Sequence, residues 1–199
     1  MESVDSILHY WFGNSADDAE VVREKTVLWW KKNPEVDEEI RRRFEAMLES
    51  EVKGELASWG NSPRGQLARM LLLDQFPRNM YRGTARAFAY DEQARRLARQ
   101  ALDQGVDRKL RPVERVFIYL PFEHSEDVQD QATGVQLFEA LLEEVPATVK
   151  QPFQNFLDFA KKHKEIVDHF KRFPHRNALL GRESTPEELE FLKRPGSSF

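Results

Sequence analysis

Proline marks the first helical position of four amphipathic segments, and this repeated signal constrains the fold more than any other feature of the chain. Asn33-Pro34 and Ser62-Pro63 each place a capping residue before the proline, whose missing N–H costs nothing at that position. Thr185-Pro186 does the same, and Glu188 completes a capping box. Arg111-Pro112 opens a further segment. These starts predict a chain built from helices.

Apolar residues recur after these starts at intervals of three and four, as one buried helix face requires. The first helix is expected to end at Gly13, and later ones at Pro77 and Pro121. Ser125 and Asp91 are predicted to cap helices. Further predicted helices cover residues 17–32, 52–59, 63–75, 92–104, 152–170 and 186–193. No segment alternates with period two, so we predict one all-α domain over residues 1–199, with about nine helices in stacked antiparallel pairs.

Composition narrows the class of protein. With 199 residues, 40% of them hydrophobic, the chain is large enough to bury a core. A net charge of −4 argues against nucleic acid as a partner, because phosphate binding needs a basic face. The apolar runs fall far short of the ~20 residues that span a bilayer, so we expect no membrane partner. No secretory signal opens the sequence, and we expect a soluble cytoplasmic protein.

The segment Tyr119–Asp127 carries the densest group of reactive side chains. Glu123, His124, Ser125, Glu126 and Asp127 follow one another directly after an apolar run. Histidine titrates near neutral pH, and a neighbouring carboxylate raises its pKa and fixes its tautomer. Glu123, His124 and Glu126 are therefore candidate catalytic residues, and Ser125 is a candidate ligand-binding residue. The structural alternative makes Ser125 the helix cap and the acids first-turn residues.

Two Phe-Pro corners flank this segment along the chain. Gln75-Phe-Pro-Arg-Asn79 lies upstream, and Arg172-Phe-Pro-His-Arg-Asn177 lies downstream. Arginine binds carboxylate or phosphate with two parallel hydrogen bonds, and amides orient polar ligands. We expect the three segments to converge on one polar pocket, in which His175 is a fourth candidate catalytic residue. The candidate ligand-binding residues at the corners are Gln75, Arg78, Asn79, Arg172, Arg176 and Asn177.

Other kinds of site fit the sequence less well. The histidines and acids lack the helix-face spacing of a metal site such as His-Glu-x-x-His, so no metal and no cofactor is predicted. Ser125 and Ser184 lack the Gly-x-Ser-x-Gly elbow of a serine nucleophile. The corner residues can also be braces that bond the open carbonyl groups of helix ends. The C-terminal carboxylate of Phe199 is a further candidate partner for one arginine.

Several irregular blocks, in order along nearly the whole chain, resemble the bacterial domain-of-unknown-function family 924. Those blocks include His9-Tyr-Trp-Phe-Gly13, Leu73–Asn79, Tyr119–Asp127, Arg172–Asn177 and Leu180–Glu188. The resemblance implies a tetratricopeptide-like helical superhelix and no assigned activity.

Two functions remain open at this stage. The first is binding of a small polar or anionic metabolite in a pocket lined by Glu, His, Arg and Asn, with or without catalysis. The second is a protein-interaction module, in which helix pairs form a groove for a peptide or partner helix.

Overall fold

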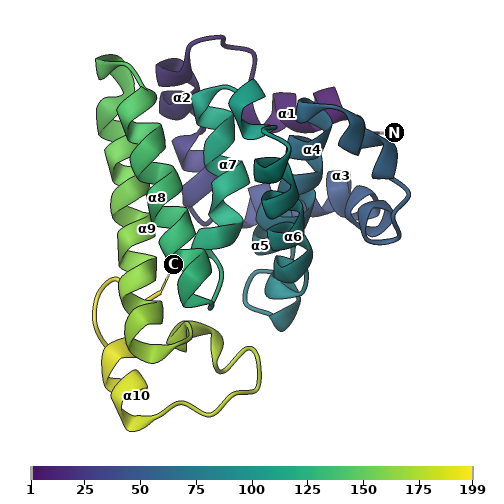
Figure 1. Cartoon of the computed structure of the whole chain (residues 1–199). Helices are drawn as coiled ribbons and strands as arrows, with labels where there is room; N and C mark the ends of the chain where they lie inside the picture. Colours follow the sequence, from purple (N-terminus) through teal and green to yellow (C-terminus); the bar gives the residue numbers. More distant parts are fainter. Residues whose placement is uncertain (1, 199) are drawn as a thin grey trace.

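The computed structural model describes residues 2–198, and this part of the chain holds helices and no strand (Figure 1). The all-α prediction is confirmed. The described residues form ten α-helices, of which α4 (Pro63–Met70) and α5 (Phe76–Met80) are joined by η2 (Leu71–Gln75) into one continuous helical run, so nine separate helical segments result. The helices are α1 (Val4–Phe12), α2 (Asp18–Trp30), α3 (Pro34–Val52), α4 (Pro63–Met70), α5 (Phe76–Met80), α6 (Asp91–Asp103), α7 (Pro112–Glu123), α8 (Val128–Glu144), α9 (Lys150–Phe170) and α10 (Pro186–Leu192). A π-helical turn, η2 (Leu71–Gln75), joins α4 to α5, and short 3₁₀ turns occupy Ala57–Asn61, Ala85–Phe88, Asp107–Lys109, Ala147–Val149 and Pro174–Arg176.

The predicted helix starts are confirmed at the atomic level. Asn33 accepts hydrogen bonds from the backbone N–H groups of the first turn of α3, and Ser62 accepts one from the first turn of α4. Thr185 and Glu188 form the reciprocal capping box of α10. Each cap satisfies N–H groups that a helix start leaves without an intrahelical partner.

Both predicted proline stops are wrong. Pro121 lies inside α7, which continues to Glu123. Pro77 lies in the first turn of α5, directly after the π turn. In that turn the Phe76 N–H bonds to the Leu71 carbonyl five residues earlier, and we attribute the tolerance of the proline ring to this wider turn. The helical run therefore passes through residues 70–80.

Three other boundaries also differ from prediction. Asp127, and not Ser125, caps α8: its carboxylate accepts hydrogen bonds from the N–H groups of Gln129 and Asp130. Asp91 is the first residue of α6 and does not cap it. The helix expected over residues 52–59 is absent, because α3 extends to Val52 and only a 3₁₀ turn follows. These differences free Ser125 and Asp91 for contacts described below.

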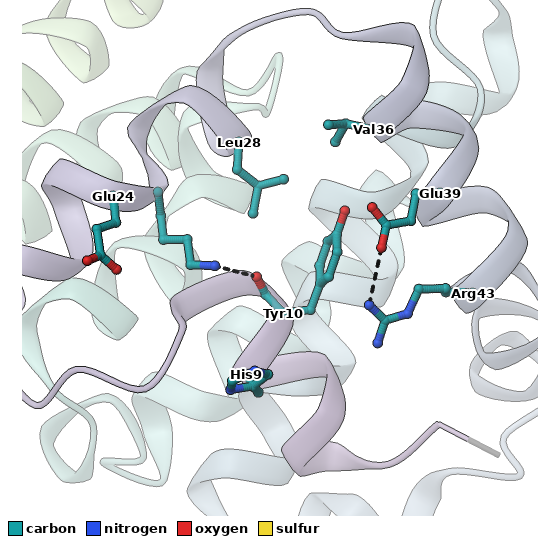
Figure 2. A pocket seen from close by; sticks show the side chains of 8 residues that line it. His9, Tyr10, Glu24, Leu28, Val36, Glu39 and Arg43 are labelled. Carbon is teal, nitrogen blue, oxygen red and sulfur yellow. Dashed lines mark hydrogen bonds and ion pairs between the residues drawn. The ribbon is translucent and has the colours of Figure 1, made fainter.

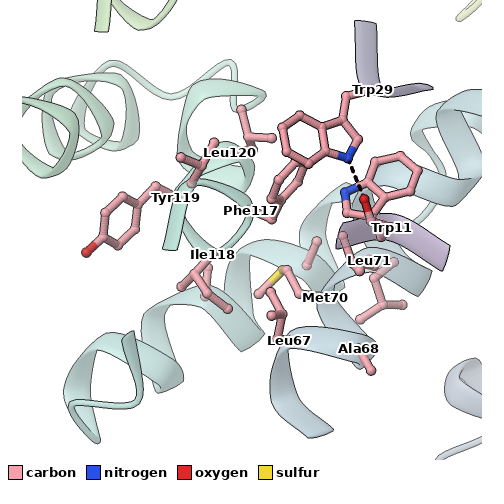
Figure 3. Packing of buried hydrophobic residues seen from close by; sticks show 14 of the residues in the cluster. Trp11, Trp29, Leu67, Ala68, Met70, Leu71, Phe117, Ile118, Tyr119 and Leu120 are labelled. Atoms are coloured by element: carbon pink, nitrogen blue, oxygen red, sulfur yellow. Dashed lines mark hydrogen bonds between the residues drawn. The ribbon is translucent and has the colours of Figure 1, made fainter. Parts of the chain in front are cut away.

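Helix α7 forms the centre of the molecule. Every residue from Val113 to Glu123 is buried, as expected for a helix with neighbours on all sides. It packs against α2, α4, α6, α8 and α9. The ring of Phe117 contacts Trp11 and Trp29, whose indole N–H donates to the Trp11 carbonyl oxygen (Figure 3). This aromatic cluster joins the N-terminal helices to the central one.

The C-terminal part of the chain lies at one end of the α8–α9 pair (Figure 1). Helices α7, α8 and α9 lie side by side, and α8 and α9 run antiparallel because the connection between them is short. A small cluster of Ile166, Val167 and Phe173 is separate from the main core and packs against Phe191 of α10. No helix within residues 2–198 is both long and apolar enough to cross a membrane. The tetratricopeptide-like superhelix stays a prediction.

Candidate functional site

The three segments singled out in the sequence approach one another at the end of α7. The Glu126 carboxylate accepts a hydrogen bond from the Phe173 backbone N–H at 2.8 Å, which links the central segment to the downstream corner. Asp91 links the two corners, because it forms ion pairs with both Arg78 and Arg176. One polar network therefore spans all three segments.

Asp74 anchors this network from the upstream helix. Its side chain is completely buried, and it lies in the π turn η2. One carboxylate oxygen lies 2.7 Å from His124 Nδ1, and the other accepts from the Gln75 amide at 2.6 Å. Burial acts to raise the pKa of Asp74, but the charge and hydrogen bond of His124, with Arg78 and Gln75, hold that pKa below its usual value.

Glu123 and His163 form a second buried pair beside the first. His163 Nδ1 lies 3.1 Å from Glu123 Oε1 and 2.8 Å from the Phe159 carbonyl oxygen. Burial and the nearby Asp74 charge raise the pKa of Glu123 to about 8. Burial also lowers the pKa of His163 to about 3. At neutral pH both partners are therefore uncharged, whereas Asp74 is ionised.

Two arginines and one aromatic ring close the side of the network nearest α6. Arg78 Nη2 lies 2.8 Å from Asp91 Oδ1, and Arg176 Nη1 lies 3.3 Å from Asp91 Oδ2. Both guanidinium groups lie over the Phe88 ring. Arg78 Cζ is 4.9 Å from the ring centroid, and Arg176 Cζ is 4.6 Å from it. Burial, with the Arg78 charge, lowers the pKa of Arg176 to about 10. Arg176 still carries its charge at neutral pH, and Asp91 compensates it.

Glu126 ties the C-terminal segment to this network. Its carboxylate receives two hydrogen bonds from Arg182, at 2.6 and 2.9 Å, in addition to the one from Phe173. Burial acts to raise the pKa of Glu126, but these partners outweigh it and lower the pKa. The neighbouring His175 is held neutral, because burial and the Arg176 charge lower its pKa to about 4.

Four of the predicted ligand-binding residues bond to partners outside this network. Ser125 donates to Asp130 at 2.7 Å, and Asn79 donates to Asp37 at 2.9 Å. Arg172 and Asn177 both bond to Glu188, which the capping box of α10 places there. These side chains connect helices to one another, as the architectural alternative describes. The network described above includes the other predicted residues, which are Gln75, Arg78, Glu123, His124, Glu126, His175 and Arg176.

Four members of the network were not among the residues predicted from sequence, namely Asp74, Asp91, His163 and Arg182. Asp74 follows three leucines in a buried run, and an acid at such a position is the signal that could have found it. His163 continues the buried stripe of Leu157, Ala160 and Val167, although lysines flank it.

Within residues 2–198, no group of three or more acids and histidines is arranged to hold a metal ion. The predicted contact of the C-terminal carboxylate falls on Phe199, which lies outside the described residues.

The observations define a class of all-helical proteins with a buried network of acids, arginines and histidines at the end of a central helix. A family model described as "Bacterial protein of unknown function (DUF924)" matches residues 7–196, and the chain belongs to this family. The fold is similar to the solved structure of the protein of unknown function ATU0120 from Agrobacterium tumefaciens. The two chains share 36% sequence identity with a TM-score of 0.80 over 96% of each. No curated protein matches the chain.

Proposed function

We propose that this network is a binding site for a small polar molecule, in which His124 accepts a proton from the ligand. The observation that carries the proposal is the 2.7 Å contact between His124 Nδ1 and the fully buried carboxylate of Asp74. A histidine oriented by a buried carboxylate is a recurrent arrangement in general-base catalysis.

The contact with Asp74 determines which nitrogen of His124 can act. A carboxylate can only accept a hydrogen bond, so Nδ1 carries a proton, and Nε2 is the nitrogen that presents a lone pair when the ring is neutral. The His124 side chain is 16% exposed, whereas that of Asp74 is fully enclosed. Solvent can therefore reach the histidine but not the acid that orients it.

The opposite charge states of two neighbouring carboxyl groups also support proton transfer. Asp74 is ionised, and Glu123, with its pKa near 8, holds a proton at neutral pH. Carboxyl groups whose environments separate their pKa values commonly mark the acid and base of a site. The π turn that carries Asp74 is a second such mark, because π turns occur frequently at functional sites.

The charges of the network favour an uncharged or singly charged ligand over a polyanion. The sequence suggested that Arg78, Arg172 and Arg176 bind an anion. Arg78 and Arg176 share Asp91, and Asp74 is a second acid 3.9 Å from Arg78. Arg172 forms an ion pair with Glu188, so each positive charge already lies beside a carboxylate. A polyanion would have to displace these acids and leave them buried without a partner, which is costly.

A thermal-shift screen tests this proposal. The wild-type protein is measured against sugars, carboxylic acids, nucleosides and amines, beside His124→Ala and the control His169→Ala. His169 is an exposed histidine that contacts Glu187 and does not belong to the His124 network. A ligand at 100 times its Kd adds about 2.7 kcal/mol, or roughly 5–10 °C for a chain of this length.

We expect such a shift in wild type and in His169→Ala, and its loss in His124→Ala. No shift with any compound class would contradict the proposal. An equal shift in His124→Ala would place the ligand elsewhere and contradict it as well. In either case Arg176→Lys is the next variant, since a strong loss of stability there supports a purely architectural network.

A protein-interaction module is the second candidate, and one observation favours it. Val27 and Trp30 lie one helical turn apart on α2, and their exposed fractions are 54% and 44%. An interaction partner that covers them would remove this apolar surface from water. Loss of a stoichiometric partner in Trp30→Ala, with binding retained in His124→Ala, would support this candidate.

A further inference from the structure

A cleft separate from the buried network lies where α1, α2 and α3 meet (Figure 2). Its volume is about 390 Å³, within the range of small-molecule sites and near its lower end. Tyr10 lies in the middle of the cleft, with Leu28 and Val36 across from it and Glu39 beside it (Figure 2). Its other lining residues are His9, Glu24, Lys25 and Arg43. Nothing in the network around His124 explains this group of side chains.

Lys25 supplies a positive charge with hydrogen-bonding capacity to spare. Its ammonium donates to the Tyr10 carbonyl oxygen at 3.1 Å, where it also complements the negative end of α1. An ammonium group has three N–H donors, and this contact uses one of them. The stem of Lys25 lies close to Gly13, the residue after α1, because a Cβ atom at Gly13 would lie 3.1 Å from Lys25 Cε. A carboxylate in the cleft would find a positioned cation.

Glu39 supplies the matching negative charge. It accepts a long hydrogen bond of 3.4 Å from Arg43, whose guanidinium makes its shorter contact of 2.9 Å with Glu2. Glu39 is therefore only weakly engaged by Arg43, and its side chain is 42% exposed. An ammonium group in the cleft would find a carboxylate with accepting capacity left.

The remaining wall is apolar apart from one hydroxyl group. Leu28 and Val36 are half-buried and pack against the main core. Burial, the Glu39 charge and a hydrogen bond to Glu39 raise the pKa of Tyr10 to about 12, so its phenol keeps its proton at neutral pH. The cleft thus presents Lys25 and Glu39, a neutral hydroxyl and an apolar surface within a small volume, and Glu24 and Arg43 are the other charged residues of its lining.

We propose that this cleft binds a small zwitterion with an apolar side chain, of the α-amino acid class. The ligand carboxylate would pair with Lys25, its ammonium with Glu39, and its side chain with Leu28 and Val36. Both charged groups of such a ligand would have an oppositely charged partner when they leave bulk water. A ligand with only one of these charges would make only one of the two ion pairs.

Three related compounds and two variants test this proposal by isothermal titration calorimetry. L-leucine carries both charges, L-leucinamide only the ammonium, and N-acetyl-L-leucine only the carboxylate. Wild type is expected to bind L-leucine at least about tenfold more tightly than either analogue. Lys25→Met should abolish the preference over L-leucinamide, and Glu39→Gln should abolish the preference over N-acetyl-L-leucine. These ratios compare ligands within one protein, so a general loss of stability does not change them.

Lys25→Arg, which keeps the charge, should restore most of the preference over L-leucinamide, and His124→Ala should behave as wild type. Absence of saturable L-leucine binding to wild type at millimolar concentrations would overturn the proposal. The proposal would also be overturned if the preferences for L-leucine over its two analogues survived in both Lys25→Met and Glu39→Gln. Loss of L-leucine binding in His124→Ala would overturn it as well. Because none of these cleft residues belongs to the His124 network, failure here leaves the proposed function intact.

Discussion

Glu123 and Asp74 are buried carboxyl groups in one network, and their surroundings move their pKa values in opposite directions. Asp74 has a histidine, an amide and an arginine to stabilise its negative charge. Glu123 is equally enclosed, and the charge that acts on it is that of Asp74, which is repulsive. The protonated form of Glu123 has the lower free energy, because a second buried negative charge would lack a compensating positive charge.

The raised pKa of Glu123 makes stability depend on pH in a defined direction. A carboxyl group whose pKa rises from 4.5 to about 8 on folding stabilises the folded state fully below pH 4.5. This contribution is lost as the pH rises toward 8, because the unfolded chain releases the proton first. His163, with its pKa lowered from 6.5 to about 3, is neutral in both states above pH 6.5.

Glu123→Gln removes this titration and keeps the shape of the protonated acid. Between pH 6.5 and 8 we expect wild type to lose about 1.4 kcal/mol per pH unit relative to the variant. Over this window the difference amounts to about 2 kcal/mol. Urea unfolding of both proteins at several pH values measures it, with the exposed Glu143→Gln as control. Parallel pH profiles of wild type and Glu123→Gln would show that Glu123 is ionised throughout.

The sequence identified His124 and Glu123 but not their partners, and the reason is physical. Reactive groups in a short polar segment stand out, whereas Asp74 and His163 come from other helices and are surrounded in sequence by leucines and lysines. Their roles depend on which helix faces meet at the end of α7. A single sequence predicts the face of each helix but not which faces pack together.

At the scale of elements, the start of α4 depends on a close backbone approach. A Cβ atom at Gly65 would lie 2.1 Å from the Trp59 carbonyl oxygen and 2.8 Å from its carbon. Both atoms belong to the backbone of the preceding 3₁₀ turn, so the clash cannot be relieved by moving a flexible side chain.

Gly65→Ala should therefore force α4 away from this turn and destabilise the protein by about 2–3 kcal/mol. For a chain of this length this corresponds to a fall in Tm of about 5–10 °C. Arg64→Lys changes the neighbouring residue but keeps the positive charge near Asp5 and the buried Glu114, and it should stay within about 0.5 kcal/mol of wild type. Differential scanning calorimetry of the two variants decides the matter, and equal Tm values would refute the steric argument.

Helix starts were predictable because they are local, and helix ends at proline were not. Capping by Asn33, Ser62 and Thr185 involves atoms only two or three residues away. Whether Pro77 or Pro121 ends a helix depends on the backbone around it, which a π turn or tight burial can adjust. Propensity alone favours a break at both positions, but the π turn overrides it at Pro77 and the packing around α7 overrides it at Pro121.

At the scale of the whole molecule, the C-terminal segment (residues 173–198) is joined to the main helical body but does not share its core. Its apolar cluster is small and separate from the main core. Polar links therefore carry much of its attachment, chiefly those of Glu126 with Arg182 and the Phe173 N–H. A segment held in this way is expected to open locally at lower free energy than the helices around α7.

Glu126→Gln should loosen this attachment without unfolding the rest. The neutral amide weakens the ion pair with Arg182 and the charge-assisted bond from Phe173, each worth about 1.5–3 kcal/mol. We expect backbone amides of residues 173–198 to exchange about 10- to 100-fold faster, with α7 and α8 unchanged. Hydrogen exchange followed by mass spectrometry measures both regions at once.

The matched control is Glu187→Gln, which removes an acid from the same segment. Glu187 contacts His169 on the surface, where both side chains are more than half exposed. Such pairs contribute about 0–1 kcal/mol, so exchange should stay close to wild type. Faster exchange throughout Glu126→Gln would mean that the C-terminal segment and the α7 core unfold together. An unchanged pattern would mean that Arg176 and the small apolar cluster suffice to hold the segment, because Asp91 and Phe88 bind it from the α6 side.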